Sequence, residues 1–197
     1  MHSVWKTSIR FTIVTTILLG LGYPLLVTGI AGLLFPRQAA GSLIKLNDGT
    51  VIGSELLAQS FTSDRYFHPR PSAANYSDSS TFKSDSTTPP SGGSNLAQSS
   101  KTLVTRIQGD IDKLAAQNPG KPVPIDLVTT SASGLDPDIT PDAAYYQAPR
   151  VAKARNLSEE SVQKLIEKHI TKRQLGLLGE PRVNVLELNI DLDKLAK

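Results

Sequence analysis

The sequence predicts a mixed α/β domain of the α+β type on a single N-terminal transmembrane helix. Residues 11–35 form an apolar run of 25 residues without a charged side chain. Residues 36–197 are polar and contain no second run long enough to cross a bilayer. Short β-prone runs and segments of helical periodicity alternate along that remainder. We therefore expect a cytoplasmic N-terminus over 1–10, a span over 11–35 and an extracytoplasmic α/β domain over 36–197.

The length of the apolar run favours a membrane span. A helix rises about 1.5 Å per residue, so 25 residues reach roughly 37 Å, which exceeds the roughly 30 Å hydrocarbon layer. A cleaved signal peptide is the alternative, but its apolar region is about 7–15 residues long. Residues 35–40 also lack a small-x-small cleavage pair. An uncleaved anchor is the favoured interpretation.

The basic residues near the span predict its orientation. Lys6 and Arg10 precede it, whereas only Arg37 follows it before Lys45. The positive-inside rule then places the N-terminus in the cytoplasm. We expect a single-pass protein of the cell (inner) membrane whose C-terminal domain is extracytoplasmic.

Composition excludes several classes of function. Without Lys6 and Arg10, the remaining 19 basic and 18 acidic residues nearly balance, so a nucleic-acid-binding surface is not predicted. The chain has no cysteine, which excludes disulfides, thiolate catalysis and cysteine metal sites.

Small or kink-permitting residues recur at every fourth position of the span. These positions are Thr12, Thr16, Gly20, Pro24, Thr28 and Gly32. Such a stripe lets a partner helix approach closely, although glycine, threonine and proline are also frequent in membrane helices generally. Pro24 removes the helical donor for the Gly20 carbonyl, so we expect a kink between these two residues.

The first part of the domain predicts a hairpin, a short helix and a long loop. The hairpin covers 41–54, with an Asn-Asp-Gly turn at 47–49. A short helix is expected over 55–61, and an irregular loop over 62–95. Aromatic residues in this loop are expected to fix it to the core or to a partner: Tyr66, Phe67 and Tyr76.

Helical periodicity then predicts a helix over 96–117, with Ser94 or Asn95 as its N-cap. The β-prone run at 122–130 is expected to form a strand.

Capping signals locate two further helices. One opens at Thr140, and Pro149 is expected to interrupt it. The other opens at Ser158 and is expected to end near Gly176.

The last apolar segment, 183–192, predicts a strand. Its apolar residues change parity between Val185 and Leu186, which indicates a bulge or burial on both faces.

Seven segments spread over nearly the whole chain form a combined pattern. They are Tyr23-Pro24-Leu25, Gly41-Ser42-Leu43-Ile44, residues 66–73 (YFHPRPSA), residues 91–96 (SGGSNL), Ser133-Gly134-Leu135-Asp136, residues 149–156 (PRVAKARN) and residues 183–189 (VNVLELN). Together they resemble the KdpC family, one of the component chains of the bacterial Kdp potassium-transporting ATPase. One departure is Asp138, at a position that is often histidine in this family.

The resemblance implies a non-catalytic accessory subunit of an ATP-driven, high-affinity potassium uptake complex. Its partners would be a channel-like potassium-translocating subunit, a P-type ATP-hydrolysing subunit, a small single-span subunit and the lipid bilayer. No bound cofactor is expected, because the complex handles ATP and potassium. For the family, a catalytic-chaperone role has been proposed in which the KdpC chain raises the ATP affinity of the hydrolysing subunit.

A candidate nucleotide-binding loop is formed by Ser91, Gly92, Gly93 and Ser94. Backbone N–H groups before a helix N-terminus can hold a phosphate. The loop lacks the Lys-Ser/Thr pair of a Walker motif, so a flexible loop with an N-cap is the alternative. An extracytoplasmic position would also separate this loop from cytosolic ATP.

Two further sites are considered. Asp136 and Asp138 offer carboxylate oxygens to a cation, although aspartates beside a proline commonly serve turns. His68, with Asp64 and Ser72, is the one compact set that resembles hydrolase chemistry, and a structural contact is the alternative. The competing function is therefore a stand-alone, membrane-anchored hydrolase or solute-binding module. Isolation as an active lone monomer would favour that competing function, and co-purification with an ATPase would favour membership of a complex.

Overall fold

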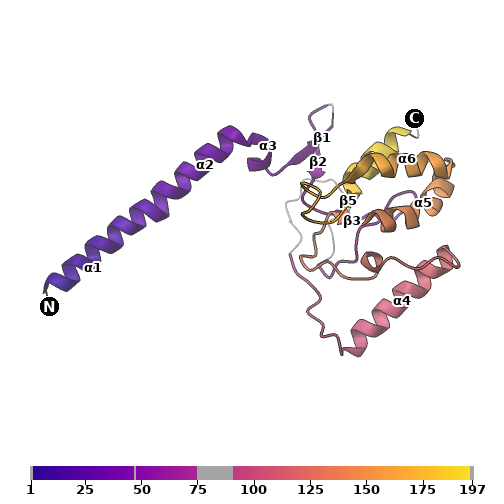
Figure 1. Ribbon diagram of the computed structural model, residues 1–197, viewed down its shortest axis with the longest axis horizontal. Coiled ribbons are helices and arrows are strands. Elements are labelled where there is room, and N and C mark those ends of the chain that lie inside the picture. The colour runs from indigo at the N-terminus through magenta and orange to yellow at the C-terminus, as the bar shows by residue number, and fades with distance from the viewer. Residues whose placement is uncertain (1, 47, 75–90, 196–197) are drawn as a thin grey trace. The chain divides into compact units, whose positions relative to one another are not determined.

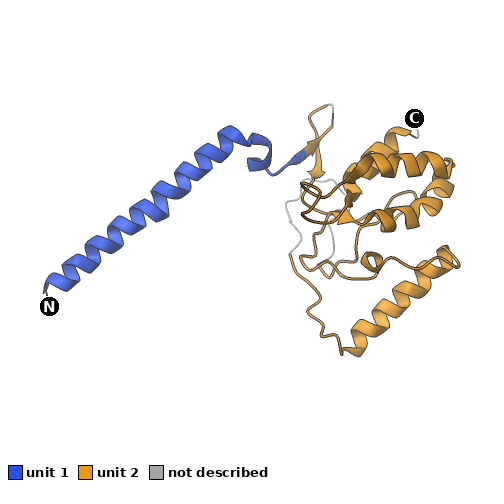
Figure 2. Ribbon diagram, in the orientation of Figure 1, with its two compact units in different colours: residues 1–43 blue, residues 44–197 orange. Residues whose placement is uncertain are grey.

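The computed structural model describes residues 2–46, 48–74 and 91–195. The chain divides into two compact units, Met1–Leu43 and Ile44–Lys197 (Figure 2). Tyr76, and Asn47 of the predicted turn, lie outside the described residues.

The first unit is dominated by one long helix. It consists of α1 (His2–Thr15), a π-helical segment (Thr16–Gly22) and α2 (Tyr23–Leu34), and the short α3 (Pro36–Ala39) follows. The stretch Ser3–Leu34 is long and apolar enough to cross a membrane. No side chain of the π segment or of α2 is buried in the protein, as expected for a helix whose surroundings are lipid or partner helices.

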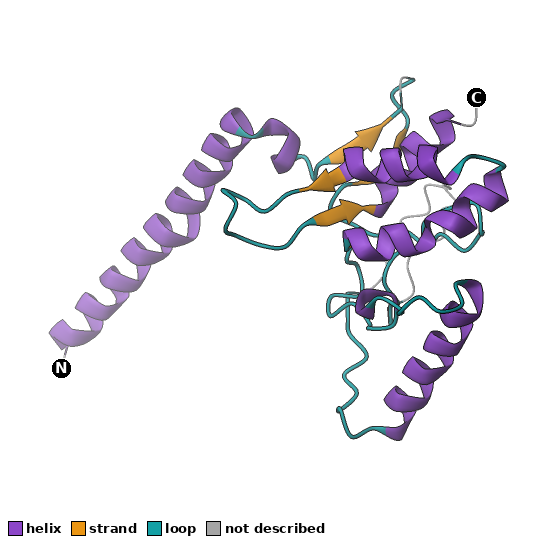
Figure 3. Ribbon diagram, turned by 45° about the vertical axis from the view of Figure 1, so that its right-hand side comes forward, coloured by secondary structure: helices purple, strands orange, loops and turns teal. Residues whose placement is uncertain are grey.

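The π segment replaces the predicted kink. Because proline has no N–H, Pro24 cannot donate to the carbonyl four residues earlier. The Tyr23 N–H donates to Leu18 O, five residues back. Figures 1 and 3 show the helix continuing through this region without a sharp bend. The disturbance near Pro24 is thus a local widening of the helix.

The predicted hairpin is confirmed. Strands β1 (Leu43–Lys45) and β2 (Val51–Ser54) pair across a turn in which Gly49 has φ +83°. The Asp48 carboxylate accepts from the Thr50 N–H at 2.9 Å.

The helix predicted over 55–61 is wrong. The segment forms a turn and then extended chain. The Ala58 N–H donates to Leu135 O at 3.0 Å, and the Gln59 amide donates to Ile52 O at 2.8 Å. Tertiary hydrogen bonds therefore replace the helical ones.

A three-stranded antiparallel sheet lies at the centre of the domain. Its order is β3 (Asp138–Ile139), β5 (Arg182–Asn184) and β4 (Ile170–Thr171). Val183 pairs with Ile139 on one side and with Ile170 on the other. In Figure 1, α5 (Pro141–Arg155) and α6 (Glu159–His169) lie beside these strands.

The hydrophobic core combines apolar side chains from α5, α6, β5 and the C-terminal helix α7 (Val185–Leu195) with one aromatic ring from the 62–95 loop. The fully buried members include Phe67, Val151, Val162, Ile166, Val183, Leu188 and Leu192. The prediction that an aromatic residue fixes this loop to the core is confirmed for Phe67.

The start of α5 is confirmed, but its predicted interruption is wrong. The Thr140 hydroxyl accepts from the Ala143 N–H, as an N-cap does. The helix continues through Pro149 to Arg155. Ala148 and Val151 on either side of the proline are fully buried, so packing of this face compensates for the missing hydrogen bond.

The N-cap of α6 at Ser158 is confirmed, because its hydroxyl accepts from the Ser161 N–H. The predicted end near Gly176 is wrong, since α6 ends at His169. The chain leaves the helix at Ile170 to pair with Val183. Strand pairing therefore overrides the continuing helical propensity.

The strand predicted over 183–192 is mostly wrong. Only Arg182–Asn184 is a strand, and α7 begins at Val185. The change of parity at Val185 marks this junction, because the buried residues of α7 follow helical spacing: Val185, Leu186, Leu188, Asn189 and Leu192.

The middle of the domain also differs from prediction. The helix predicted from residue 96 is α4 (Lys101–Gln117), with Ser100 at the N-cap position instead of Ser94 or Asn95. Asn95 has φ +52°, which is incompatible with a helix start there. The strand predicted at 122–130 is wrong, because the segment contains a 3₁₀ turn at Ile125–Leu127.

Candidate functional site

Two side-chain amides hold the backbone of residues 67 and 68. Asn189 Oδ1 accepts from the Phe67 N–H at 2.9 Å, and its Nδ2 donates to Phe67 O at 3.0 Å. Gln147 does the same for His68, at 2.8 Å and 3.1 Å. Both amides are almost fully buried. They make the hydrogen bonds to the backbone that a paired β-strand would otherwise make to this extended segment.

Two arginines of α5 hold the preceding residues. Arg150 donates to Asp64 O at 2.7 Å and to Tyr66 O at 3.0 Å. Arg155 donates to Asp193 Oδ1 at 2.6 Å and lies over the Tyr66 ring, 4.7 Å from its centroid. Burial lowers the pKa of Arg150, with Asp64 opposing that shift.

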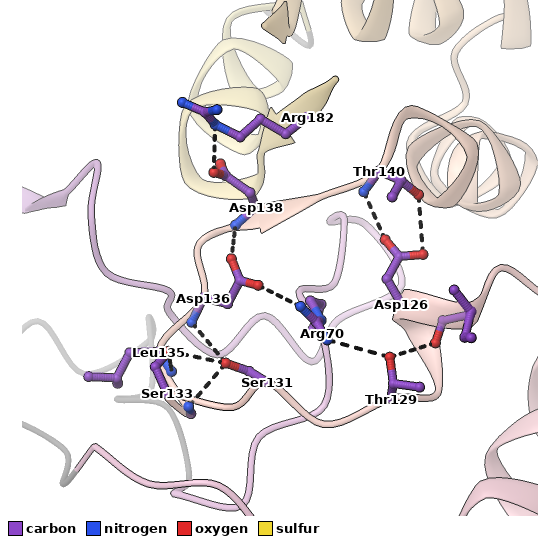
Figure 4. Close-up of polar contacts among 12 residues, drawn as sticks. Arg70, Asp126, Thr129, Ser131, Ser133, Leu135, Asp136, Asp138, Thr140 and Arg182 are labelled. Atoms are coloured by element: carbon purple, nitrogen blue, oxygen red, sulfur yellow. Dashed lines mark hydrogen bonds and ion pairs between the residues drawn. The ribbon is translucent and has the colours of Figure 1, made fainter. Parts of the chain in front are cut away.

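Arg70 connects this segment to the loop before β3 (Figure 4). Its Nη1 donates to Asp136 Oδ2 at 2.8 Å, and its Nη2 lies 3.4 Å from Thr129 Oγ1. The Ser131 N–H donates to Pro71 O at 2.9 Å, and the Ser72 hydroxyl donates to Gly134 O at 2.7 Å. The two loops are therefore joined by backbone and side-chain bonds together.

The buried Ser131 side chain forms hydrogen bonds with the backbone of the loop before β3. Its hydroxyl oxygen accepts from the Gly134 N–H at 3.0 Å and from the Asp136 N–H at 3.3 Å (Figure 4). Ser133 Oγ lies 3.2 Å away and accepts from the Leu135 N–H. Ser131 is 1% exposed, so these bonds are shielded from water.

The two aspartates proposed as cation ligands lie close together, but each has a basic partner. Asp136 is bonded to Arg70, and Asp138 Oδ2 accepts from Arg182 Nε at 2.9 Å. Asp136 Oδ1 also accepts from the Asp138 N–H. Burial raises the pKa of Asp138, and Arg182 opposes the rise. Among the described residues, no group of three or more histidine or acidic side chains could hold a metal ion.

A third aspartate positions the start of α5. Asp126 is buried and accepts from the Thr140 N–H at 2.8 Å and from its hydroxyl at 3.2 Å (Figure 4). The Thr140 hydroxyl in turn caps α5, so one carboxylate links the 3₁₀ turn to β3 and α5.

The candidate nucleotide loop does not lie at a helix N-terminus, because α4 begins at Lys101. The Gly92 N–H and the Ser91 hydroxyl both donate to Ser133 O, at 2.8 Å and 2.9 Å. A Cβ on Gly134 would lie 2.5 Å from Gly92 O. These glycines thus serve close packing between two loops, and the feature on which phosphate binding depended is missing.

The histidine set proposed for hydrolysis is not assembled as a triad. His68 Nε2 lies 3.0 Å from Ser63 O, whereas the Ser72 hydroxyl is bonded to Gly134 O. The Asp64 side chain is 73% exposed and lies 3.7 Å from Arg150. Burial, with the charge of Arg150, lowers the pKa of His68. His68 acts here as a structural residue.

Two clefts border the His68–Pro71 segment. One, of about 480 Å³, is lined by residues that include Phe61, His68 and Arg70. The other, of about 290 Å³, lies between this segment and α4 and includes Lys113 and Arg150. Both clefts are open to solvent at the domain surface.

Sequence reasoning missed the residues that build this framework. It named His68, Asp136 and Asp138 as site residues but did not predict the side chains that bond them, which are Gln147, Arg70 and Arg182, or that Asn189 bonds Phe67. The two amides share a sequence signal, because each is a polar residue on an otherwise apolar, buried helical face, as Asn189 is between Leu188 and Leu192. Arg70 lies outside any helix or strand and has no such signal.

Nearly the whole chain matches one known protein family. A family model described as KdpC, K+-transporting ATPase, c chain, matches residues 5–194. The chain belongs to the KdpC family. A relative from Methylobacterium nodulans is 56% identical over 185 residues, or 92% of each chain. One from Bradyrhizobium diazoefficiens is 55% identical over 195 residues, covering 97% of this chain and 96% of the relative. Both are named potassium-transporting ATPase KdpC subunit.

Part of the KdpC resemblance seen in the sequence lies in residues that make these contacts. Four of its segments supply the bonded groups: residues 66–73, 133–136, 149–156 and 183–189. In the fold, residues 66–73 contact each of the other three segments.

Proposed function

We propose that this KdpC-family chain is a non-catalytic accessory subunit of an ATP-driven potassium uptake complex. Its role is to stabilise the assembly of the channel-like, ATP-hydrolysing and small single-span subunits. The observation that carries the proposal is the match over more than nine tenths of both chains to relatives named as this subunit. The paired aspartates and the structural role of His68 support it.

The proposed orientation places the N-terminus in the cytoplasm and residues 36–197 outside it. The charges of Lys6 and Arg10 support this topology. Any effect of the domain on the ATP affinity of the hydrolysing subunit is then transmitted through partner subunits, since about 30 Å of hydrocarbon separates the domain from cytosolic ATP.

The span is proposed to pack against partner helices through its stripe. In an α-helix, a step of four residues turns about 400°, so such a stripe drifts by about 40° at each step. The turns of the π segment at Thr16–Gly22 contain more residues, which reduces the drift in the middle of the span. The geometry supports a common face for the middle of the stripe.

Assembly can be tested by co-purification. An affinity tag on the ATP-hydrolysing subunit should recover this chain with the other subunits, and removal of the chain should reduce the yield of intact complex and potassium-dependent ATP hydrolysis. Isolation of the chain as an active monomer, with an intact pump in its absence, would overturn the proposal.

Orientation can be tested with single cysteines, because the chain has none of its own. A cysteine at exposed Lys121 should react with a membrane-impermeant maleimide in intact spheroplasts, and one at Ser3 should react only after lysis. The reverse pattern would place the domain in the cytoplasm and allow direct ATP contact.

A further inference from the structure

The loop between β4 and β5 presents three leucines to the solvent. Leu175, Leu177 and Leu178 are 91%, 80% and 60% exposed. They contribute almost nothing to the core of the domain. Clustered exposed apolar side chains of this kind are typical of a surface that contacts a membrane or another protein.

The backbone of this loop is well bonded. Gln174 and Leu178 exchange two backbone hydrogen bonds of 2.9 Å each. An ion pair between Arg173 and Glu180 closes the base of the loop. Leu175 has φ +53°, a conformation that leucine rarely adopts. A hydrogen-bonded turn therefore keeps the three leucine side chains exposed, although burial stabilises none of them.

The charges around the leucines suit an anionic bilayer surface. Residues 172–182 contain three basic side chains, Lys172, Arg173 and Arg182, and one acidic one, Glu180. Arg173 is ion-paired with Glu180 and Arg182 with Asp138, so this cluster has a net charge of +1, supplied by Lys172. Leucine side chains suit contact with the acyl chains of a membrane, and the basic side chains beside them suit contact with its anionic headgroups.

Chain connectivity keeps this loop near a bilayer. The spanning helix ends at Leu34 and the domain begins at Ile44, so nine residues join them. Nine extended residues reach at most about 30 Å. The domain is therefore confined near the membrane surface, on whichever side it lies, and a small apolar contact becomes effective at this high local concentration.

We propose that the segment Lys172–Arg182, which is this loop with the first residue of β5, is a second, interfacial membrane contact of this protein. Leu175, Leu177 and Leu178 enter the boundary between headgroups and acyl chains of the bilayer that the N-terminal helix spans, while the basic residues lie among anionic headgroups. The contact restrains the domain on the membrane surface. The proposal does not depend on the identity of the partner subunits.

The test uses the full chain in vesicles containing phosphatidylglycerol. Leu177→Cys provides a single labelling site, because the chain has no cysteine, and the substitution removes no buried contact. With an environment-sensitive fluorophore at this site, lipids brominated near the headgroup should reduce emission at least two-fold. Ile125→Cys is the matched control: Ile125 is 73% exposed but lies outside the loop, and its label should be unaffected.

A second arm tests the lipid charge. Replacing phosphatidylglycerol by a zwitterionic lipid should weaken quenching at position 177 at least two-fold. Equal, water-like emission at positions 177 and 125 would overturn the proposal. Loss of water-like emission at position 177 only after the other pump subunits are added would also overturn it, because the loop would then contact a protein.

Discussion

The side chain of Asn189 makes both backbone hydrogen bonds of Phe67, a residue 122 positions away in the chain. The two residues are 2% and 0% exposed, so water cannot replace either bond. Gln147 on α5 completes the arrangement at His68. A segment without regular secondary structure is thereby fixed between two helices.

Replacing Asn189 by leucine should destabilise the domain strongly. The two side chains are similar in size, but leucine would leave the buried N–H and C=O of Phe67 without partners. Each unsatisfied buried group costs about 1–3 kcal/mol, so we expect a loss of about 3 kcal/mol. Thermal unfolding of the detergent-solubilised full chain measures it. Gln163→Leu is the control, because its amide bonds Glu159 on an exposed surface, and its effect should stay within about 0.5 kcal/mol.

Gly134→Ala should destabilise the contact between the two loops. Gly134 has φ +72°, and an added Cβ would lie 2.5 Å from Gly92 O. Gly120→Ala is the matched control, since Gly120 has φ +81° and nothing within 4 Å of its added Cβ. We expect about 1 kcal/mol for the control from backbone strain alone and at least about 2 kcal/mol for Gly134→Ala. Equal losses in unfolding free energy would mean that the close approach has no energetic role.

Asp136→Asn should lower stability without changing potassium affinity. The carboxylate is partly exposed and is bonded to Arg70, so its charge is already neutralised locally. We expect a loss of about 1 kcal/mol in unfolding free energy. The apparent potassium affinity of ATP hydrolysis by the assembled complex should stay at the wild-type value. A weaker affinity in this variant, with the complex intact, would restore a cation role for the loop.

Local chemistry made some elements predictable. The N-caps Thr140 and Ser158 need only a hydroxyl and a free N–H three residues later, so sequence alone located them. The hairpin turn at Gly49 is equally local. These elements are determined by a few neighbouring residues.

Elements fixed by distant contacts were not predictable. Residues 183–192 carry an apolar pattern that suits a strand or a helix, and only the pairing of Val183 with two other strands shows where the strand ends. The candidate functional site is likewise fixed by contacts between residues that are distant in the sequence. Arg70 and Asp136 are 66 residues apart, and no local pattern indicates that they pair.

The stability of the domain should fall with pH below about 6.5 through His68. Burial, reinforced by Arg150, lowers the pKa of His68 in the folded state. The unfolded chain then binds more protons between its own pKa and the lower folded value, so unfolding becomes easier as pH falls through this window. His68→Gln should reduce the drop in melting temperature between pH 7.5 and pH 5.5. An unchanged drop in the variant would show that other groups are responsible.

Bulky substitutions on the stripe should weaken assembly. Gly32 lies in α2, where an added Cβ meets nothing within 4 Å, so Gly32→Leu leaves the isolated helix intact and obstructs only a neighbouring helix. Gly20 lies in the π segment, and Gly20→Leu additionally tests that region. Each should reduce recovery of this chain with the tagged ATP-hydrolysing subunit several-fold.

The control is Ile30→Phe, which enlarges an exposed side chain of the same helix about 160° around the axis from Gly32. Recovery should remain at the wild-type level in this variant. If Ile30→Phe and Gly32→Leu reduce recovery equally, the defect reflects general crowding in the membrane and the stripe is not a specific face. If neither does, assembly depends on the domain alone, because the span then contributes no close helix contact at these positions.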